Sequence, residues 1–258
     1  MSAVLLALVA GALIGLALGA LGGGGSVLAV PALIYLLDFT PAAATTASLL
    51  IVTAGSATAL YAHAASGNVR WKSGALFAAA GLLPSVGAAA LAARVPDAVL
   101  TAAFAATAAL AGLHMLKPAI PDRQPRRAGP ARAGSVRAGS ARAVGAGAGL
   151  GAVTGFLGVG GGFLAVPALV GILGLRMRAA AGTGLLVITV NSVAALAARA
   201  DTGAPVRWAV VAPFAGAAIL GAWDGRRLAA RVSGPALQRV FGIALMAVAL
   251  LMLTDAMR

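Results

Sequence analysis

Two glycine-rich breaks inside apolar stretches are the residues of this chain best suited to binding a ligand. The first reads Gly22-Gly23-Gly24-Gly25-Ser26, and the second, 136 positions later, reads Gly158-Val159-Gly160-Gly161-Gly162. Each precedes a matching apolar segment, Leu28-Ala29-Val30-Pro31-Ala32-Leu33 or Leu164-Ala165-Val166-Pro167-Ala168-Leu169. Glycine runs leave backbone N–H and C=O groups bare, which is tolerated at membrane depth only where they line a cavity. The two copies therefore predict a duplicated chain with a polar central site.

A short helix is predicted to begin after each break, at about Ser26 and Gly162. The first N–H groups of a helix lack intrahelical partners and carry the positive end of its dipole, so they attract anions. The Ser26 hydroxyl is expected either to cap its helix or to donate to the ligand. The glycines predicted to bind substrate are Gly23, Gly24, Gly25, Gly160, Gly161 and Gly162. The alternative is that they only permit close helix packing, as we expect for Gly11, Gly15 and Gly19.

Hydroxyl and amide side chains follow each short segment and complete the predicted site. They are Thr46 and Ser48 in the first half, then Thr183, Asn191 and Ser192 in the second. Hydroxyls in membrane helices often bond to their own backbone, which is the structural alternative for each of them. An amide near mid-helix needs a partner, so Asn191 is expected to bond to the ligand or to another helix. Pro31 and Pro167 are predicted to kink the short segments.

The composition predicts a polytopic membrane protein. Hydrophobic residues make up 61% of the chain and charged residues 10%, and the mean hydropathy is +0.99. The apolar runs reach the roughly 20 residues that span a bilayer, so we expect a multi-pass protein of the inner (plasma) membrane in contact with lipid. The first twenty residues lack a basic start and are expected to be a helix of the fold instead of a signal peptide.

The chain is predicted to be all-α, with about five helical segments in each half. The expected ranges are 3–20, 27–37, 42–63, 74–92 and 98–116, then 144–157, 163–174, 178–199, 206–222 and 235–253. The second segment of each half has about a dozen residues, or roughly 18 Å, which is too short for a hydrocarbon core of roughly 30 Å. It is therefore either a half-helix or one arm of a re-entrant hairpin.

Residues 1–116 form the first predicted membrane repeat and residues 144–258 the second. Between them, residues 117–143 carry arginines among Ala, Gly, Ser and Pro, which is typical of a solvated linker. If each half crosses the membrane an odd number of times, 15 of the 19 basic residues fall on one side. The positive-inside rule therefore favours an inverted duplication with a cytoplasmic linker.

Several classes of function are disfavoured by the residues that are present. The net charge of +13 comes from residues between apolar runs, where they orient the chain, so nucleic acid is not an expected partner. His63 and His114 have no further ligand at metal-binding spacing, so we expect neither a metal nor another cofactor. A nucleophile paired with a base is likewise not found, so an enzyme is not expected. A cation or metal carrier, or another small-solute permease, stays as the alternative, and a homo-oligomer is left open.

The paired breaks, with Leu28-Ala29-Val30-Pro31-Ala32-Leu33 and its second copy, resemble the TauE/SafE family of membrane transporters, also called sulfite exporters. The resemblance covers nearly the whole chain. It implies secondary transport of small sulfur-containing anions such as sulfite or organosulfonates. If the ligand lies between the two short helices, Gly24→Val and Gly161→Val should abolish transport, whereas Gly15→Ala on the packing face should be mild.

Overall fold

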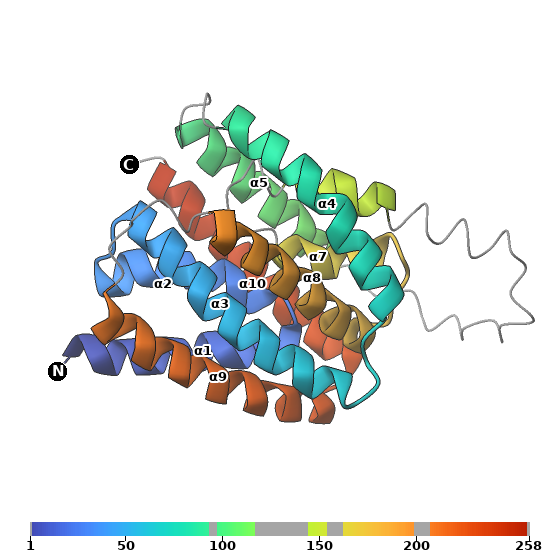
Figure 1. Cartoon of the computed structure of the whole chain (residues 1–258), viewed down its shortest axis with the longest axis horizontal. Coiled ribbons are helices and arrows are strands. Elements are labelled where there is room, and N and C mark those ends of the chain that lie inside the picture. The colour runs from blue at the N-terminus through green and yellow to red at the C-terminus, as the bar shows by residue number, and fades with distance from the viewer. Residues whose placement is uncertain (1, 93–96, 117–143, 154–161, 199–206, 257–258) are drawn as a thin grey trace, which may run out of the picture.

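The computed structural model describes residues 2–92, 97–116, 144–153, 162–198 and 207–256, which form a bundle of helices without strands (Figure 1). The first half contains α1 (Ser2–Leu21), α2 (Gly24–Leu37), α3 (Pro41–Ala64), α4 (Trp71–Ala92) and α5 (Asp97–Leu116). The second half contains a helix at Val144–Val153, α7 (Gly162–Gly171), α8 (Met177–Ala198), α9 (Trp208–Arg231) and α10 (Gly234–Ala256). The all-α prediction is confirmed.

Helix lengths agree with a membrane protein. Among the described residues, five helices are long and apolar enough to cross a bilayer, namely Ala3–Leu21, Ala43–Ala64, Met177–Ala197, Trp208–Arg231 and Gly234–Thr254. The predicted short segments are α2, with 14 residues, and α7, with 10. The helix predicted over 206–222 instead runs to Arg231. Its last turns contain charged residues, but they are also rich in Arg, Leu and Ala, which have high helix propensity. The predicted linker at 117–143 lies outside the described residues.

Local signals explain where the first half breaks. Gly22 has φ +76°, a left-handed conformation that glycine adopts without steric cost, and its N–H donates to the Leu18 carbonyl at 2.9 Å. Asp38 ends α2 in the left-handed region, with φ 51°. The side chain of Thr40 then accepts from the Ala43 N–H at 3.4 Å and caps α3. These residues separate α1, α2 and α3 into independent helices.

Glycine stripes let α1 pack directly on the backbone of α9, side by side in Figure 1. Glycines of the helix at Val144–Val153 pack on the backbone of α4 in the same way. A Cβ atom built on any glycine of the two stripes would collide with a carbonyl of the facing helix. The pairs are Gly11 with Phe214, Gly15 with Ala218 and Gly19 with Ala222, and in the second half Gly147 with Phe77 and Gly151 with Gly81. Equivalent glycines therefore make equivalent contacts in the two halves, as duplication predicts.

The contact at Gly15 overturns the expectation that Gly15→Ala is mild. A Cβ atom there would lie 2.7 Å from the Ala218 Cα, which belongs to a helix backbone and not to a flexible side chain. The expectation was correct about the packing face but underestimated how closely the helices approach. We now expect the substitution to push α1 and α9 apart.

Contacts between α3 and α8, which correspond in the duplicated sequence, show that these helices run in opposite directions. Ser56 of α3 bonds to Thr189 of α8, and further along α3 His63 lies beside Gly182, which comes earlier in α8. The corresponding pair α5 and α10 is antiparallel in the same way. This arrangement is consistent with an inverted duplication, and its orientation in the membrane stays a prediction.

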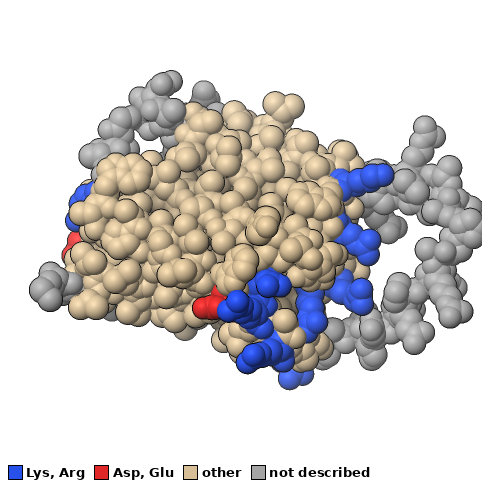
Figure 2. Space-filling view, turned by 60° about the horizontal axis from the view of Figure 1, so that its bottom comes forward, with Lys and Arg blue, Asp and Glu red and all other residues tan. Residues whose placement is uncertain are grey.

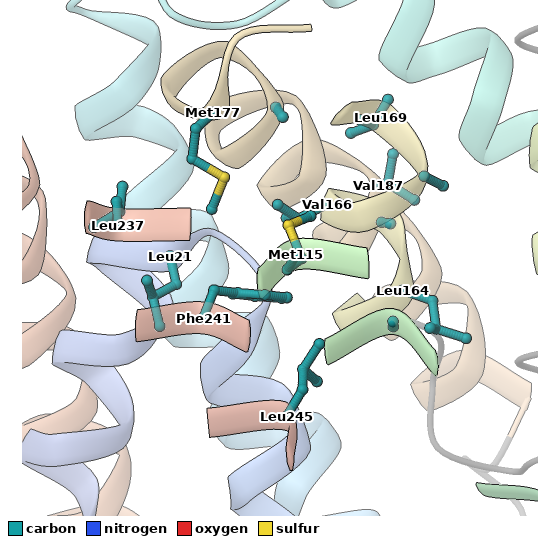
Figure 3. Close-up of a cluster of buried hydrophobic side chains, with 14 of the residues drawn as sticks. Leu21, Met115, Leu164, Val166, Leu169, Met177, Val187, Leu237, Phe241 and Leu245 are labelled. Atoms are coloured by element: carbon teal, nitrogen blue, oxygen red, sulfur yellow. The ribbon is translucent and has the colours of Figure 1, made fainter. Parts of the chain in front are cut away.

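Each short helix is surrounded by its own apolar core. Around α7 the core draws on α1, α5, α8 and α10, with Met115, Leu169 and Phe241 at most 1% exposed (Figure 3). Around α2 it draws on α1, α3, α8 and α9. The two short helices also contact one another. The core thus holds α2 and α7 together inside the bundle.

Basic side chains gather at one end of the molecule (Figure 2). Helix ends from both halves meet there. Arg178, at the start of α8, donates to the Ala230 and Val232 carbonyls near the end of α9. Arg226 of α9 donates to the Ser66 hydroxyl just after α3. We name this the basic end. Arg207 lies apart from the basic end and donates to the carbonyl of Leu37, the last residue of α2, at 2.6 Å.

Candidate functional site

The start of α2 contains the first predicted group of ligand-binding residues. Gly23 is the N-cap, and it has no side-chain cap. The Ser26 hydroxyl is buried and donates to the Gly23 carbonyl at 2.7 Å, so its proton is used inside the first turn. This bond is not the predicted cap, and donation to a ligand stays a prediction. The Ser26 oxygen can still accept a hydrogen bond.

Two glycines of the first break are required by packing. A Cβ atom on Gly22 would strike the backbone of α8 at Ala181, and one on Gly25 would lie 2.5 Å from the Ile14 carbonyl of α1. The packing interpretation therefore accounts for Gly22 and Gly25, although it does not exclude a second role for the Gly25 N–H. For Gly23 and Gly24 both interpretations, ligand binding and helix packing, stay predictions.

The start of α7 contains the second predicted group. Gly162 is the first residue of α7, as predicted, while Gly160 and Gly161 lie outside the described residues. All residues from Leu164 to Leu169 are buried, and the hydrophobic ones among them are between 0% and 7% exposed. Pro31 lies inside α2 and Pro167 inside α7. The kinks assigned to these prolines stay predictions.

The hydroxyls of α3 are buried in the bundle and bond mainly along their own helix. Ser48 donates to the Thr45 carbonyl at 2.8 Å, and Ser56 donates to the Thr53 carbonyl at 3.3 Å. Thr46 is 9% exposed and also has an interaction partner. The bonds of Ser48 and Ser56 to their own helix backbone are the structural alternative to ligand binding that we expected for such hydroxyls. They leave the hydroxyl oxygens able to accept, and the Thr53 Oγ1 is buried without a partner.

The polar side chains of α8 reach the first half of the chain. Thr183 is fully buried, and its Oγ1 accepts from the Arg70 N–H at 3.1 Å. The Thr189 hydroxyl donates to the Leu185 carbonyl of its own helix at 2.8 Å and lies 3.0 Å from the Ser56 hydroxyl. The Asn191 Oδ1 is buried with no partner, and Ser192 is 2% exposed. An unpartnered amide oxygen in a membrane helix is costly, so it marks the place along α8 where a ligand or a water is needed.

An apolar groove of about 570 Å³ lies along α1 and α2, away from these polar groups. It is lined almost entirely by aliphatic side chains, including Leu13, Leu28 and Leu36, with Thr254 of α10 at its edge. Such a lining suits lipid and not a small anion. In the described part of the chain, no three His, Cys, Asp or Glu side chains gather as metal ligands.

Two polar residues at the basic end, the buried His63 and the partly exposed Arg226, were not predicted as site residues. His63 is 4% exposed and bonds through Nε2 to the Gly19 carbonyl at 2.9 Å. Arg226 lies on α9 and donates to the Ser66 hydroxyl. The break at Gly22 was a signal for the first contact, because a helix that ends there leaves carbonyls such as that of Gly19 free. No local signal pairs Arg226 with α3, since 160 positions separate it from Ser66.

Long apolar helices, two short helices in contact and polar groups buried between the halves are typical of a multi-pass membrane protein. The chain belongs to the sulfite exporter TauE/SafE family, whose model matches residues 7–252. It is 39% identical over 108 residues to a probable membrane transporter protein of Xylella fastidiosa strain 9a5c. That alignment covers 42% of this chain and 41% of the relative. The corresponding protein of strain Temecula1 is 38% identical over the same shares. No solved structure matches the chain.

Proposed function

We propose that the protein is a secondary transporter that exports small sulfur-containing anions such as sulfite or organosulfonates. Residues 1–116 and 144–258 are its two membrane repeats, and residues 117–143 are a cytoplasmic linker. The observation that carries the proposal is the contact between α2 and α7, two short helices that follow glycine breaks inside an apolar bundle. The family to which the chain belongs supports the same class of substrate.

The site attracts anions without buried ammonium or guanidinium groups. No Lys or Arg occurs before Arg70, so α1, α2 and α3 carry none, and none occurs between Val144 and Leu175. An anion at the starts of α2 and α7 is held instead by helix dipoles, backbone N–H groups and hydroxyls. Oxygen atoms of a sulfite or a sulfonate are suitable acceptors for such donors.

Transport proceeds by alternating access, in which one half of the bundle moves against the other around the site. The antiparallel pairing of α3 with α8 supports this mechanism, because carriers with inverted repeats place their substrate at the repeat interface. Such a carrier exchanges substrate across the membrane, and its rate saturates with substrate concentration.

The test is a flux assay with purified protein in liposomes. Sulfite, thiosulfate, an organosulfonate, sulfate and divalent cations are supplied one at a time, and uptake and exchange are measured. We expect saturable transport of sulfite or the organosulfonate, with exchange faster than net flux. Transport of a divalent cation and none of the sulfur anions would favour the cation carrier instead. Unsaturable conductance at channel rates would refute the carrier mechanism.

A further inference from the structure

A pair of unsatisfied polar atoms lies at the basic end beside the first glycine break. The Nδ1 atom of His63 and the Nε atom of Arg226 are both buried, and neither has a hydrogen-bond partner. His63 lies in the last turn of α3, and the N–H of Ser66, three residues later, donates to the His63 carbonyl at 3.1 Å. Arg226 donates to the Ser66 hydroxyl at 3.0 Å, so its guanidinium lies beside the residue three positions after His63.

The bond to Gly19 fixes which nitrogen of His63 carries the proton. A carbonyl oxygen can only accept, so His63 Nε2 must be the donor in the 2.9 Å contact. In the neutral imidazole the other nitrogen, Nδ1, then has a lone pair and no hydrogen. His63 therefore offers a buried acceptor.

Arg226 offers the opposite group. Its Nε always carries a hydrogen, because the guanidinium stays protonated in proteins. One terminal nitrogen of Arg226 is engaged by Ser66, and the Trp223 ring lies 5.8 Å from its Cζ atom. The Nε–H is left as a buried, charged donor.

Two other arginines at the basic end have partners of their own. Arg227, next to Arg226, pairs with Asp224 at 3.4 Å, and both side chains are exposed. Arg178 of α8 is held by backbone carbonyls of α9. The positive charge of Arg226 therefore has no carboxylate bonded to it in the described part of the chain.

We propose that His63 and Arg226 form a binding site for a small oxyanion that retains a proton, such as hydrogen sulfite or hydrogen phosphate. One oxygen accepts from Arg226 Nε–H, and the hydroxyl of the same anion donates to His63 Nδ1. A single ligand of this kind satisfies both buried atoms and balances the charge. The inference goes beyond the proposed transport function, because equilibrium binding shows it without transport.

The site lies where α1, α3, α8 and α9 meet. Gly182 of α8 packs at the Cβ atom of His63, and Gly22, which precedes α2, packs on the adjoining residue Ala181. A bound oxyanion would therefore bridge helices of both halves at the basic end, next to the break that precedes α2.

Binding to purified, delipidated protein tests the proposal by calorimetry. Phosphate and sulfite carry a proton near neutral pH, whereas sulfate and methanesulfonate do not. Sulfate and methanesulfonate can therefore present only an acceptor oxygen to the lone pair of His63 Nδ1, which repels it. We expect wild type to prefer phosphate over sulfate by at least ~10-fold, because a site built for a hydroxyl rejects an analogue without one. Equal affinity for both anions, or binding of neither, would overturn the proposal.

Three variants assign the binding to these residues. Arg226→Gln should weaken phosphate binding by ~10-fold or more, as expected for loss of a charged hydrogen bond. The matched control Arg227→Gln should change it by less than ~2-fold, because its partner Asp224 is exposed. His63→Gln retains a nitrogen that can reach the Gly19 carbonyl and lacks Nδ1, so it should lose the preference for phosphate over sulfate. An unchanged affinity in Arg226→Gln would overturn the site while leaving the transport proposal intact.

A lipid headgroup has the same chemistry as a free phosphate, and a second arm separates the two sources. The titration is repeated in nanodiscs of phosphatidylcholine alone and of phosphatidylcholine with phosphatidic acid. Competition by phosphatidic acid that disappears in Arg226→Gln would identify the headgroup as the occupant of the proposed site. Unaltered phosphate binding in both nanodiscs would identify a soluble anion.

Discussion

The hydroxyl groups of α3 and α8 are used differently although the two helices correspond in the duplicated sequence. On α3, Ser48 and Ser56 donate to carbonyls three residues earlier in the same helix. On α8, Thr183 accepts from the backbone of Arg70 in the other half, whereas Thr189 donates to the Leu185 carbonyl of its own helix at 2.8 Å and lies 3.0 Å from the Ser56 hydroxyl. The Thr183 hydroxyl of α8 thus stabilises the contact between the halves, whereas the Ser48 hydroxyl of α3 stabilises its own helix.

The two short helices also differ in how deeply their side chains are buried. Leu28 and Val30 of α2 are only partly buried, and Leu28 lines the apolar groove, whereas the matching Leu164 and Val166 of α7 are at most 7% exposed. The glycine contacts at Gly15 and Gly151, in contrast, are the same in both halves. Duplication has therefore kept the backbone packing and allowed the side chains around the site to diverge.

The orientation of the halves gives the largest expected difference, an all-or-none result. The chain has no cysteine, so single cysteines can be labelled without background. In intact cells an impermeant reagent applied outside should modify Ala256→Cys and leave Ser135→Cys unmodified, because the basic linker is expected to be cytoplasmic. Protection at position 256 together with labelling at 135 would reject this orientation.

Loss of transport is the next largest effect. Gly24→Val and Gly161→Val should both abolish sulfite flux in liposomes while the protein still inserts, because a branched side chain blocks the approach to the backbone N–H groups. Gly216→Ala on α9, where an added Cβ atom meets open space, is the control and should transport normally. If only one of the valine variants were inactive, the two breaks would have different roles, and wild-type rates in both would make them packing features.

Packing glycines should show that the two halves share one scaffold. Gly15→Ala and Gly151→Ala should each lower the free energy of unfolding in detergent by about 1–3 kcal/mol, since a methyl group is forced against a backbone. The matched controls Gly216→Ala and Gly149→Ala have open space and should be unchanged or more stable by up to about 1 kcal/mol. Equal stability of variants and controls would contradict the close approach of these helices.

Asn191 tests whether the divergent side chains of α8 serve the ligand. Asn191→Ala should weaken sulfite binding by roughly 1–3 kcal/mol, the contribution of one or two hydrogen bonds. Calorimetry on the purified variant measures the change, with melting in the absence of sulfite as the control for folding. Wild-type affinity with a lowered melting temperature would assign the amide to helix packing.

The smallest predicted effect compares one hydroxyl from each half. Thr183→Val leaves the Arg70 N–H buried without its acceptor and should destabilise the protein by about 1–3 kcal/mol. Ser48→Ala removes only a bond within α3 and should cost about 1 kcal/mol or less. Thermal unfolding of the two variants side by side gives the difference. Equal losses would remove the contrast between α3 and α8.

Sequence alone determined the helices, the two short segments and the family, because hydropathy and the positions of glycine and proline are local signals. The segments predicted over 27–37 and 163–174 correspond to α2 and α7 within a few residues. The resemblance to the TauE/SafE family was readable from the repeated break and proline, and the family model confirms it.

Only the tertiary structure decided which polar groups meet. The bonds from His63 to Gly19 and from Arg226 to Ser66 join helices that are adjacent in space but distant in sequence. The same is true of the backbone contact at Gly15, whose closeness the sequence pattern underestimated. A pattern shows that a glycine or a hydroxyl faces another helix, but its partner and its distance follow from how the whole bundle packs.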